Sequence, residues 1–134
     1  MIWTSWLRAV AVAVLALTLA VSASHAAELL MYRTAGCPWC AAWDQAIGPI
    51  YPKTEVGRRA PLRMVDLDAA KGSGVIVLLQ RPVRYSPTFV LADDGREIGR
   101  IEGYPGEDFF WGLLENLVLK LPSPRASLRS TAIR

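Results

Sequence analysis

Hydrophobic residues recur with two different periods along the chain, and the change of period separates strands from helices. Residues 28–33, with the sequence ELLMYR, form a short apolar run that predicts a buried strand. From residue 38 to residue 47 the apolar positions recur at spacings of three and four, which predicts a helix with an apolar face at Cys40, Trp43 and Ile47. The Gly48-Pro49 pair that follows is a helix-ending signal.

The second half of the chain predicts another strand, a hairpin and a closing helix. Thr54 is placed to cap a short helical turn, and residues 62–68 begin with the apolar–polar alternation typical of a strand. Two β-rich runs flank Asp94-Gly95, a dipeptide that favours a hairpin turn. A final apolar stripe with helical spacing comprises Phe109, Leu113, Leu114, Leu117 and Leu121.

The order of these elements indicates an α/β fold. One connection, residues 69–83, contains an apolar run whose periodicity alone fits either a strand or a buried helix. The remaining order of strand, helix, strand, hairpin and helix gives a mixed sheet with helices on its faces. We expect the first two strands to run parallel, joined by a right-handed crossover through the helix.

The two ends of the chain differ from the domain between them. Residues 1–26 combine Arg8, an uncharged apolar run and small residues at Ser24 and Ala26, which is the pattern of a secretory signal peptide cleaved after Ala26. The apolar run is shorter than the ~20 residues of a spanning helix; an uncleaved anchor that leaves the domain facing the periplasm is the alternative. We expect one domain over residues 27–121 and a flexible, arginine-containing tail over residues 122–134.

The net charge of the chain and its predicted export limit the classes of binding partner. The whole chain has a formal net charge of +3, and removal of Arg8 with the signal peptide lowers it further. So small a charge does not indicate nucleic-acid binding. Export would place the cysteines in an oxidising compartment. We expect a periplasmic, monomeric protein.

Cys37 and Cys40 are the two cysteines of the chain, and their spacing allows several roles. Attachment of haem would require histidine after the second cysteine, where Ala41 stands. Structural zinc usually takes four Cys or His ligands, and the one histidine, His25, lies in the predicted signal peptide. We therefore expect no metal and no cofactor. A purely structural disulfide is the alternative, although closure of so short a loop stabilises a fold by only about 2 kcal/mol.

A redox-active pair accounts for more of the local sequence. Cys37 occupies the position of a helix N-cap, and Pro38 the first helical position, where its missing N–H has no intrahelical partner. The free N–H groups of Trp39 and Cys40 can then face the Cys37 sulfur and, with the helix dipole, stabilise its thiolate. Cys37 is thus predicted to attack, and Cys40, on the apolar face, to resolve the mixed disulfide.

The motifs taken together resemble the thioredoxin fold over nearly all of the mature chain. They are CPWC after one strand, VDLD after a second, and SPTFVL before a hairpin and a closing helix. The resemblance implies a three-layer sandwich with a central mixed sheet of about four strands flanked by helices, and a helix at residues 69–81. It also implies that Pro87 follows a cis peptide bond and faces the redox pair, with Ser86 and Thr88 beside it. Without the resemblance, Pro87 reads as an ordinary strand-start proline.

A narrower resemblance, carried by GCPWCAAWDQAIGPIYPKTEVGRRAPLR, is to small periplasmic thioredoxins associated with bacterial sulfur-oxidation systems, which keep partner cysteines reduced. Two positions depart from the thioredoxin pattern. Met31 stands where thioredoxins have a buried acid, which leaves open the base that deprotonates Cys40, and Gly36 stands where they have tryptophan. The Cys-Pro-aromatic-Cys motif is closer to that of glutaredoxins, which use glutathione.

Residues around the pair are candidates for contact with the substrate. Trp39, next to Pro38, is expected to be exposed and either contacts the substrate or packs on the protein. By the resemblance, Ser86, Pro87, Gly103 and Tyr104 line the substrate groove, although GYPG could be a plain turn. Asp44 is expected to pair with a basic side chain on the helix surface rather than to take part in catalysis.

These observations predict an exported thiol–disulfide oxidoreductase that reduces disulfides or oxidised cysteines of partner proteins. The resemblance adds a sulfur-oxidation carrier protein as a partner. A reductant that works outside the cytoplasm also implies a membrane protein that passes electrons to Cys37 and Cys40. Exported oxidases of the related fold usually carry an inserted helical domain, for which a mature chain of about 108 residues has no room. The alternatives are a glutaredoxin-like, glutathione-linked reductase and a non-enzymatic exported binding module with a structural disulfide.

Overall fold

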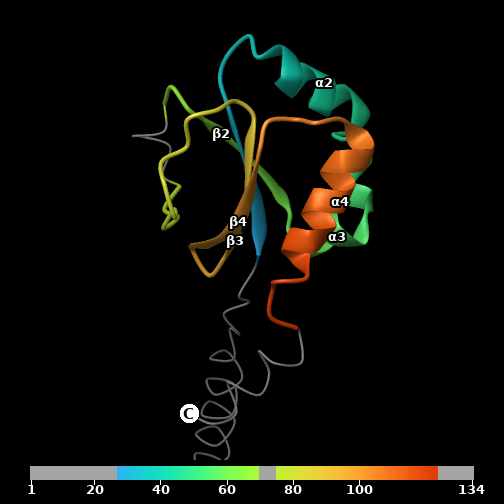
Figure 1. Cartoon of the computed structure of the whole chain (residues 1–134), viewed down its shortest axis with the longest axis vertical. Helices are drawn as coiled ribbons and strands as arrows, with labels where there is room; N and C mark the ends of the chain where they lie inside the picture. Colours follow the sequence, from blue (N-terminus) through green and yellow to red (C-terminus); the bar gives the residue numbers. More distant parts are fainter. Residues whose placement is uncertain (1–26, 70–74, 124–134) are drawn as a thin grey trace, which may run out of the picture.

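The computed structural model describes residues 27–69 and 75–123 (Figure 1). The predicted signal peptide lies outside the described residues, as do residues 124–134 of the predicted tail. Within the described ranges, no helix combines the length and the apolar character that crossing a membrane requires.

The described residues form a mixed, four-stranded sheet in the order β2-β1-β3-β4. β1 runs parallel to β2, whereas β3 runs antiparallel to both β1 and β4. The elements in chain order are β1 (Glu28–Arg33), α2 (Pro38–Ala46), the 3-10 turn η1 (Tyr51–Lys53), α3 (Glu55–Arg59), β2 (Leu62–Asp66), β3 (Thr88–Asp93), β4 (Arg96–Glu102) and α4 (Glu107–Val118). The predicted α/β class and the parallel pairing of the first two strands are confirmed.

Local signals in the sequence account for most element ends. The Thr54 side chain accepts a hydrogen bond of 2.9 Å from the Gly57 N–H and so caps α3, as predicted. The hairpin between β3 and β4 turns at Asp94 and Gly95, whose φ angles of 50° and 71° suit this dipeptide. The second strand is shorter than predicted, since β2 ends at Asp66 rather than at residue 68.

The helices cover one face of the sheet, and the main core lies between them and it (Figure 1). Trp43 of α2 packs against Phe89 of β3 and Phe110 of α4, with ring centroids 5.3 and 5.7 Å away. The predicted stripe of α4 is partly wrong, because Phe109 and Leu113 are 72% and 45% exposed. Apolar residues occupy more than one side of this helix, and packing on the sheet buries the side that carries Phe110, Leu114, Leu117 and Val118.

The opposite face of the sheet is covered by an extended segment in its described part, residues 75–83. The helix that the resemblance implied for residues 69–81 is wrong for residues 75–81, where Leu78 instead forms a parallel bridge with Arg96. Side chains alternate along this segment. Ile76 and Leu78 are exposed, whereas residues facing the sheet pack on its second apolar cluster, namely Val75, Val77, Leu79 and Val83. A period of two is the period of an extended chain.

A buried ion pair on β4 attaches this segment to the sheet. Glu97 accepts two hydrogen bonds of 2.6 Å from the Arg100 guanidinium and one of 2.8 Å from the Gln80 N–H. Arg100 in turn donates to the Arg81 carbonyl at 2.7 Å. A register shift at Leu91/Ala92 places one extra residue in β4. This bulge turns Glu97 and Arg100 toward the same face, although residues three apart on a regular strand face opposite sides.

Candidate functional site

The redox pair lies at the start of α2, as the sequence predicts. Cys37 and Cys40 form a disulfide whose Cα atoms are 5.3 Å apart. Cys37 is the N-cap of the helix, and its sulfur accepts a hydrogen bond of 3.1 Å from the Cys40 N–H. Of the two backbone donors that were expected, the Cys40 N–H makes this contact. Pro38 occupies the first turn, where its ring fits without loss of a hydrogen bond.

The two sulfurs have different environments. Cys40 is completely buried in the main core, whereas Cys37 is only partly buried and Trp39 beside it is 62% exposed. A reagent can therefore approach Cys37, while Cys40 is shielded. The helix N-terminus and the amide donor favour the charged form of Cys37, and such stabilisation lowers the pKa of a cysteine.

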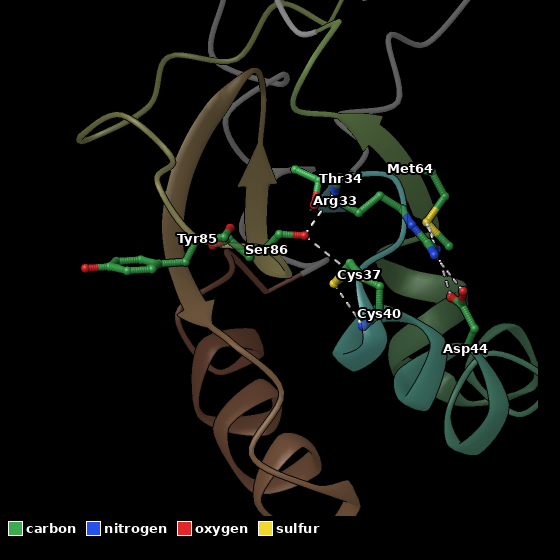
Figure 2. Close-up of a disulfide and its surroundings, with 9 residues drawn as sticks. Arg33, Thr34, Cys37, Cys40, Asp44, Met64, Tyr85 and Ser86 are labelled. Atoms are coloured by element: carbon green, nitrogen blue, oxygen red, sulfur yellow. Dashed lines mark hydrogen bonds and ion pairs between the residues drawn. A yellow bond between two sulfur atoms is a disulfide. The ribbon is translucent and has the colours of Figure 1, made fainter.

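The segment before β3 meets the pair from the other side of the site (Figure 2). The Ser86–Pro87 peptide bond is cis, and Pro87 is buried. The Ser86 hydroxyl oxygen accepts a hydrogen bond of 3.0 Å from the Thr34 N–H and lies 3.3 Å from the Cys40 sulfur. The structure thus brings a residue far along the chain into contact with the pair.

Gly103 and Tyr104 follow β4 next to this segment. The Gly103 N–H donates to the Pro87 carbonyl at 2.7 Å, which attaches the end of β4 to the loop beside the cysteines. Tyr104 instead directs its ring toward the core, 6.1 Å from the ring of Phe110. Burial, together with nearby Glu107, raises the pKa of the Tyr104 hydroxyl, so it stays neutral at physiological pH.

The side chains beneath and behind the pair do not supply a buried acid. Met31 is fully buried in the core cluster that also contains Cys40. Asp44 forms an ion pair with Arg33, with contacts of 2.8 and 3.0 Å (Figure 2). The expected basic partner is confirmed, but it comes from β1 and not from the helix surface. In the described part of the chain, Thr88 and Glu97 are the buried polar or charged residues, and Glu97 serves the opposite face of the sheet.

Sequence reasoning missed two features of this site. It assigned Ser86 to the substrate groove and did not foresee its contact with the Cys40 sulfur. It also did not identify Arg33 as the partner of Asp44. Both contacts join residues distant in sequence, and no local spacing could have indicated them. The described residues contain no cluster of three or more His, Cys, Asp or Glu side chains that could hold a metal ion.

Comparison with known proteins identifies related structures. No protein-family profile and no curated protein matches the chain. Among solved structures, the periplasmic thioredoxin SoxS from Paracoccus pantotrophus, in its reduced form, is 45% identical with a TM-score of 0.65, and the match covers 70% of this chain and 97% of that one. Trxlp from Edwardsiella tarda is 23% identical with a TM-score of 0.54, and covers 69% of this chain and 84% of its own. Fasciola hepatica thioredoxin is 21% identical with a TM-score of 0.50, with coverages of 69% and 81%.

Proposed function

Because the chain belongs to the thioredoxin family and is a thiol–disulfide oxidoreductase, we propose that it works as an exported reductant of protein disulfides or oxidised cysteines. Its likeness to a periplasmic thioredoxin supports the periplasm as its compartment, reached through the predicted signal peptide at residues 1–26. The substrate we favour is a cysteine of a sulfur-oxidation carrier protein, on the basis of the narrower resemblance in sequence.

The proposed reaction uses the two cysteines in sequence. The Cys37 thiolate attacks one sulfur of the substrate disulfide, forms a mixed disulfide and releases the other sulfur as a thiolate. Cys40 then attacks the Cys37 sulfur, which closes the Cys37–Cys40 disulfide and frees the substrate thiol. The substrate gains two electrons and two protons, and the protein loses them. Repeated turnover therefore requires an electron donor, for which we propose a membrane protein that reduces this disulfide.

The surfaces beside Cys37 suit contact with a protein substrate. Exposed Trp39 offers an apolar, aromatic area next to the sulfur that attacks, and aromatic residues are enriched in interfaces. Pro38 is also exposed. We propose that the rest of the groove is formed by Ser86, Pro87, Gly103 and Tyr104. Because the Tyr104 ring points toward Phe110 in the core, we expect Tyr104 to contribute less to this groove than the other three residues.

The single observation that carries the proposal is the Cys37 sulfur at the N-cap of α2, bonded to the Cys40 N–H. The test is insulin reduction by the oxidoreductase with an excess of dithiothreitol. We expect the wild type to reduce insulin faster than dithiothreitol alone and C37S to add nothing to that background rate. In a separate incubation without dithiothreitol, pre-reduced C40S should accumulate a mixed disulfide with the substrate. Activity of C37S equal to that of the wild type would overturn the dithiol mechanism and favour the binding module with a structural disulfide.

A redox titration tests the direction. A potential near about −270 mV matches a reductant such as thioredoxin, whereas one near about −120 mV matches an oxidant. The glutathione-linked alternative rests on the CPWC motif. It predicts faster reduction of a glutathione mixed disulfide than of insulin, and the opposite order supports the thioredoxin-like activity.

A further inference from the structure

Among the residues that the structure describes, Ser86 supplies the one side-chain hydrogen-bonding contact to the sulfur of the buried cysteine, Cys40. The Ser86 hydroxyl oxygen lies 3.3 Å from the Cys40 sulfur, inside hydrogen-bond range for sulfur. Met31, in the same core cluster as Cys40, is apolar. The Trp43 indole N–H of this cluster is buried and makes no hydrogen bond to the described residues, so it does not donate to the Cys40 sulfur in this structure. A thiolate formed in such surroundings is costly unless a donor compensates for the lost water.

The other hydrogen bond of Ser86 determines what its hydroxyl can do. The oxygen already accepts a hydrogen bond of 3.0 Å from the Thr34 N–H, which fixes its position. A hydroxyl has one O–H to donate, and in the disulfide Cys40 has no hydrogen. The Ser86 O–H is therefore the donor in the contact with Cys40. Figure 2 shows the Ser86 side chain directed toward the cysteine pair, so its O–H lies close to the sulfur that becomes a thiolate when the disulfide opens.

We propose that Ser86 is a catalytic hydrogen-bond donor that stabilises the Cys40 thiolate as it attacks the mixed disulfide, a role that rests on the proposed dithiol reaction. In this step the Cys40 sulfur forms a bond to the Cys37 sulfur, and the bond between Cys37 and the substrate sulfur breaks. The electron pair of that bond leaves with the substrate sulfur. The proton lost from Cys40 ends on the released thiol or in solvent, and Ser86 keeps its own proton throughout.

The other charged and polar side chains on the surrounding elements do not take the place of the Ser86 hydroxyl as a donor to Cys40. Arg33 of β1 and Asp44 of α2 are paired with each other at 2.8 Å. Glu107, at the start of α4, is exposed. Tyr104 is neutral at physiological pH, and burial raises the pKa of its hydroxyl further. The Thr88 hydroxyl of β3 donates to the Tyr85 carbonyl at 2.7 Å and so is already engaged.

The test separates the two steps of the reaction with a chromogenic aromatic disulfide, each half of which absorbs light once released. The reduced protein is mixed with it in a stopped-flow instrument. Attack by Cys37 releases the first half, and attack by Cys40 releases the second. The decisive pair is S86T against S86V, because threonine keeps the hydroxyl and valine has nearly the same shape without it. T88V is the matched control, since it removes a hydroxyl that lies two residues further on, at the start of β3, and that bonds to the Tyr85 carbonyl rather than to Cys40.

Because Ser86 also belongs to the proposed substrate groove, the second release of each variant is compared as a ratio to the first release of the same variant. This ratio should be about tenfold lower in S86V than in S86T, with the pH midpoint of the second release moved upward, because a hydrogen bond to a charged group is lost. T88V should resemble the wild type in both steps. Equal ratios and equal pH midpoints in S86T and S86V would overturn this role of Ser86, as would equal slowing in T88V and S86V. Absence of a first release in the wild type would instead overturn the proposed function itself.

Discussion

At the scale of single residues, reactivity depends on the surroundings of the Cys37 sulfur. It is partly exposed, sits at a helix N-terminus and accepts one amide hydrogen bond. These features favour the thiolate, so we expect the pKa of Cys37 in the reduced protein to lie below the ordinary cysteine value of about 8.5. The measurement is the rate of alkylation by iodoacetamide as a function of pH in C40S, in which Cys37 is the one remaining thiol.

The complementary variant C37S supplies the control for that experiment. Cys40 is fully buried, so its alkylation should be slow over the same pH range in the folded protein and become fast in urea. A Cys37 midpoint equal to that of free cysteine would contradict the proposed activation by the helix terminus. Fast alkylation of Cys40 in the folded protein would contradict its assignment as the shielded, resolving thiol.

Local sequence was sufficient to predict some of the site and not the rest. Cys37, Pro38 and the helix after them are adjacent in sequence, and capping preferences act over that range. The contact between Ser86 and Cys40 joins residues 46 positions apart, and only the tertiary fold brings them together. The same holds for the pair of Arg33 and Asp44.

At the scale of elements, the Glu97–Arg100 pair decides the structure of residues 75–83. Both side chains are almost fully buried, at 0% and 4% exposure. In E97Q the buried Arg100 guanidinium would keep only the more distant, partly exposed Glu102 carboxylate at 3.8 Å, so we expect a loss of about 3 kcal/mol in the free energy of unfolding. Urea unfolding measures this loss, and hydrogen exchange should locate the largest loss of protection at the Gln80 N–H. E115Q, on the exposed side of α4, is the control and should change stability by less than about 0.5 kcal/mol.

The same pair predicts how stability depends on pH. Burial on its own would raise the pKa of Glu97, but hydrogen bonds from Arg100 and Gln80 outweigh it and hold the pKa below its ordinary value. A carboxyl group with a lowered pKa in the fold stabilises the protein above its unfolded pKa of about 4.3, and this contribution is lost as pH falls through the folded value. The wild type should therefore lose its advantage over E97Q below about pH 4. A constant difference at all acidic pH values would contradict this assignment.

Helices and strands whose hydrophobic residues follow one period could be predicted from the sequence. Segments whose hydrophobic residues fit two periods, or two sides of a helix, could not. Residues 75–79 are all apolar, so the sequence shows no alternation of apolar and polar positions. The alternation appears only in the structure, where every second side chain packs on the sheet. Its extended course depends on partners on β4, which sequence periodicity does not encode. In α4, Phe109 and Phe110 are adjacent, and only packing on the sheet distinguishes the buried ring from the exposed one.

At the scale of the whole molecule, the redox pair and the buried ion pair serve opposite faces of one sheet. Cys40 belongs to the core under the helices, whereas Glu97 attaches the segment on the other face. Contributions from separated sites that share no partner usually add. E97Q should thus lower the stability of the oxidised and the reduced protein by the same amount.

The difference between those two stabilities reports the direction of the reaction. A thermodynamic cycle links this difference in unfolding free energy to the redox potential. If the oxidised form is the more stable one, folding favours the disulfide; if the reduced form is more stable, folding favours the dithiol. A reductant favours its disulfide, while a strong oxidant favours its dithiol. We expect the oxidised protein to unfold with a free energy about 2 kcal/mol higher than the reduced one, the size of loop closure over so short a span. Urea unfolding with and without a reducing agent, in wild type and E97Q, measures both quantities. Greater stability of the reduced form would make this protein an oxidant, and a redox difference altered by E97Q would show that the two faces are coupled.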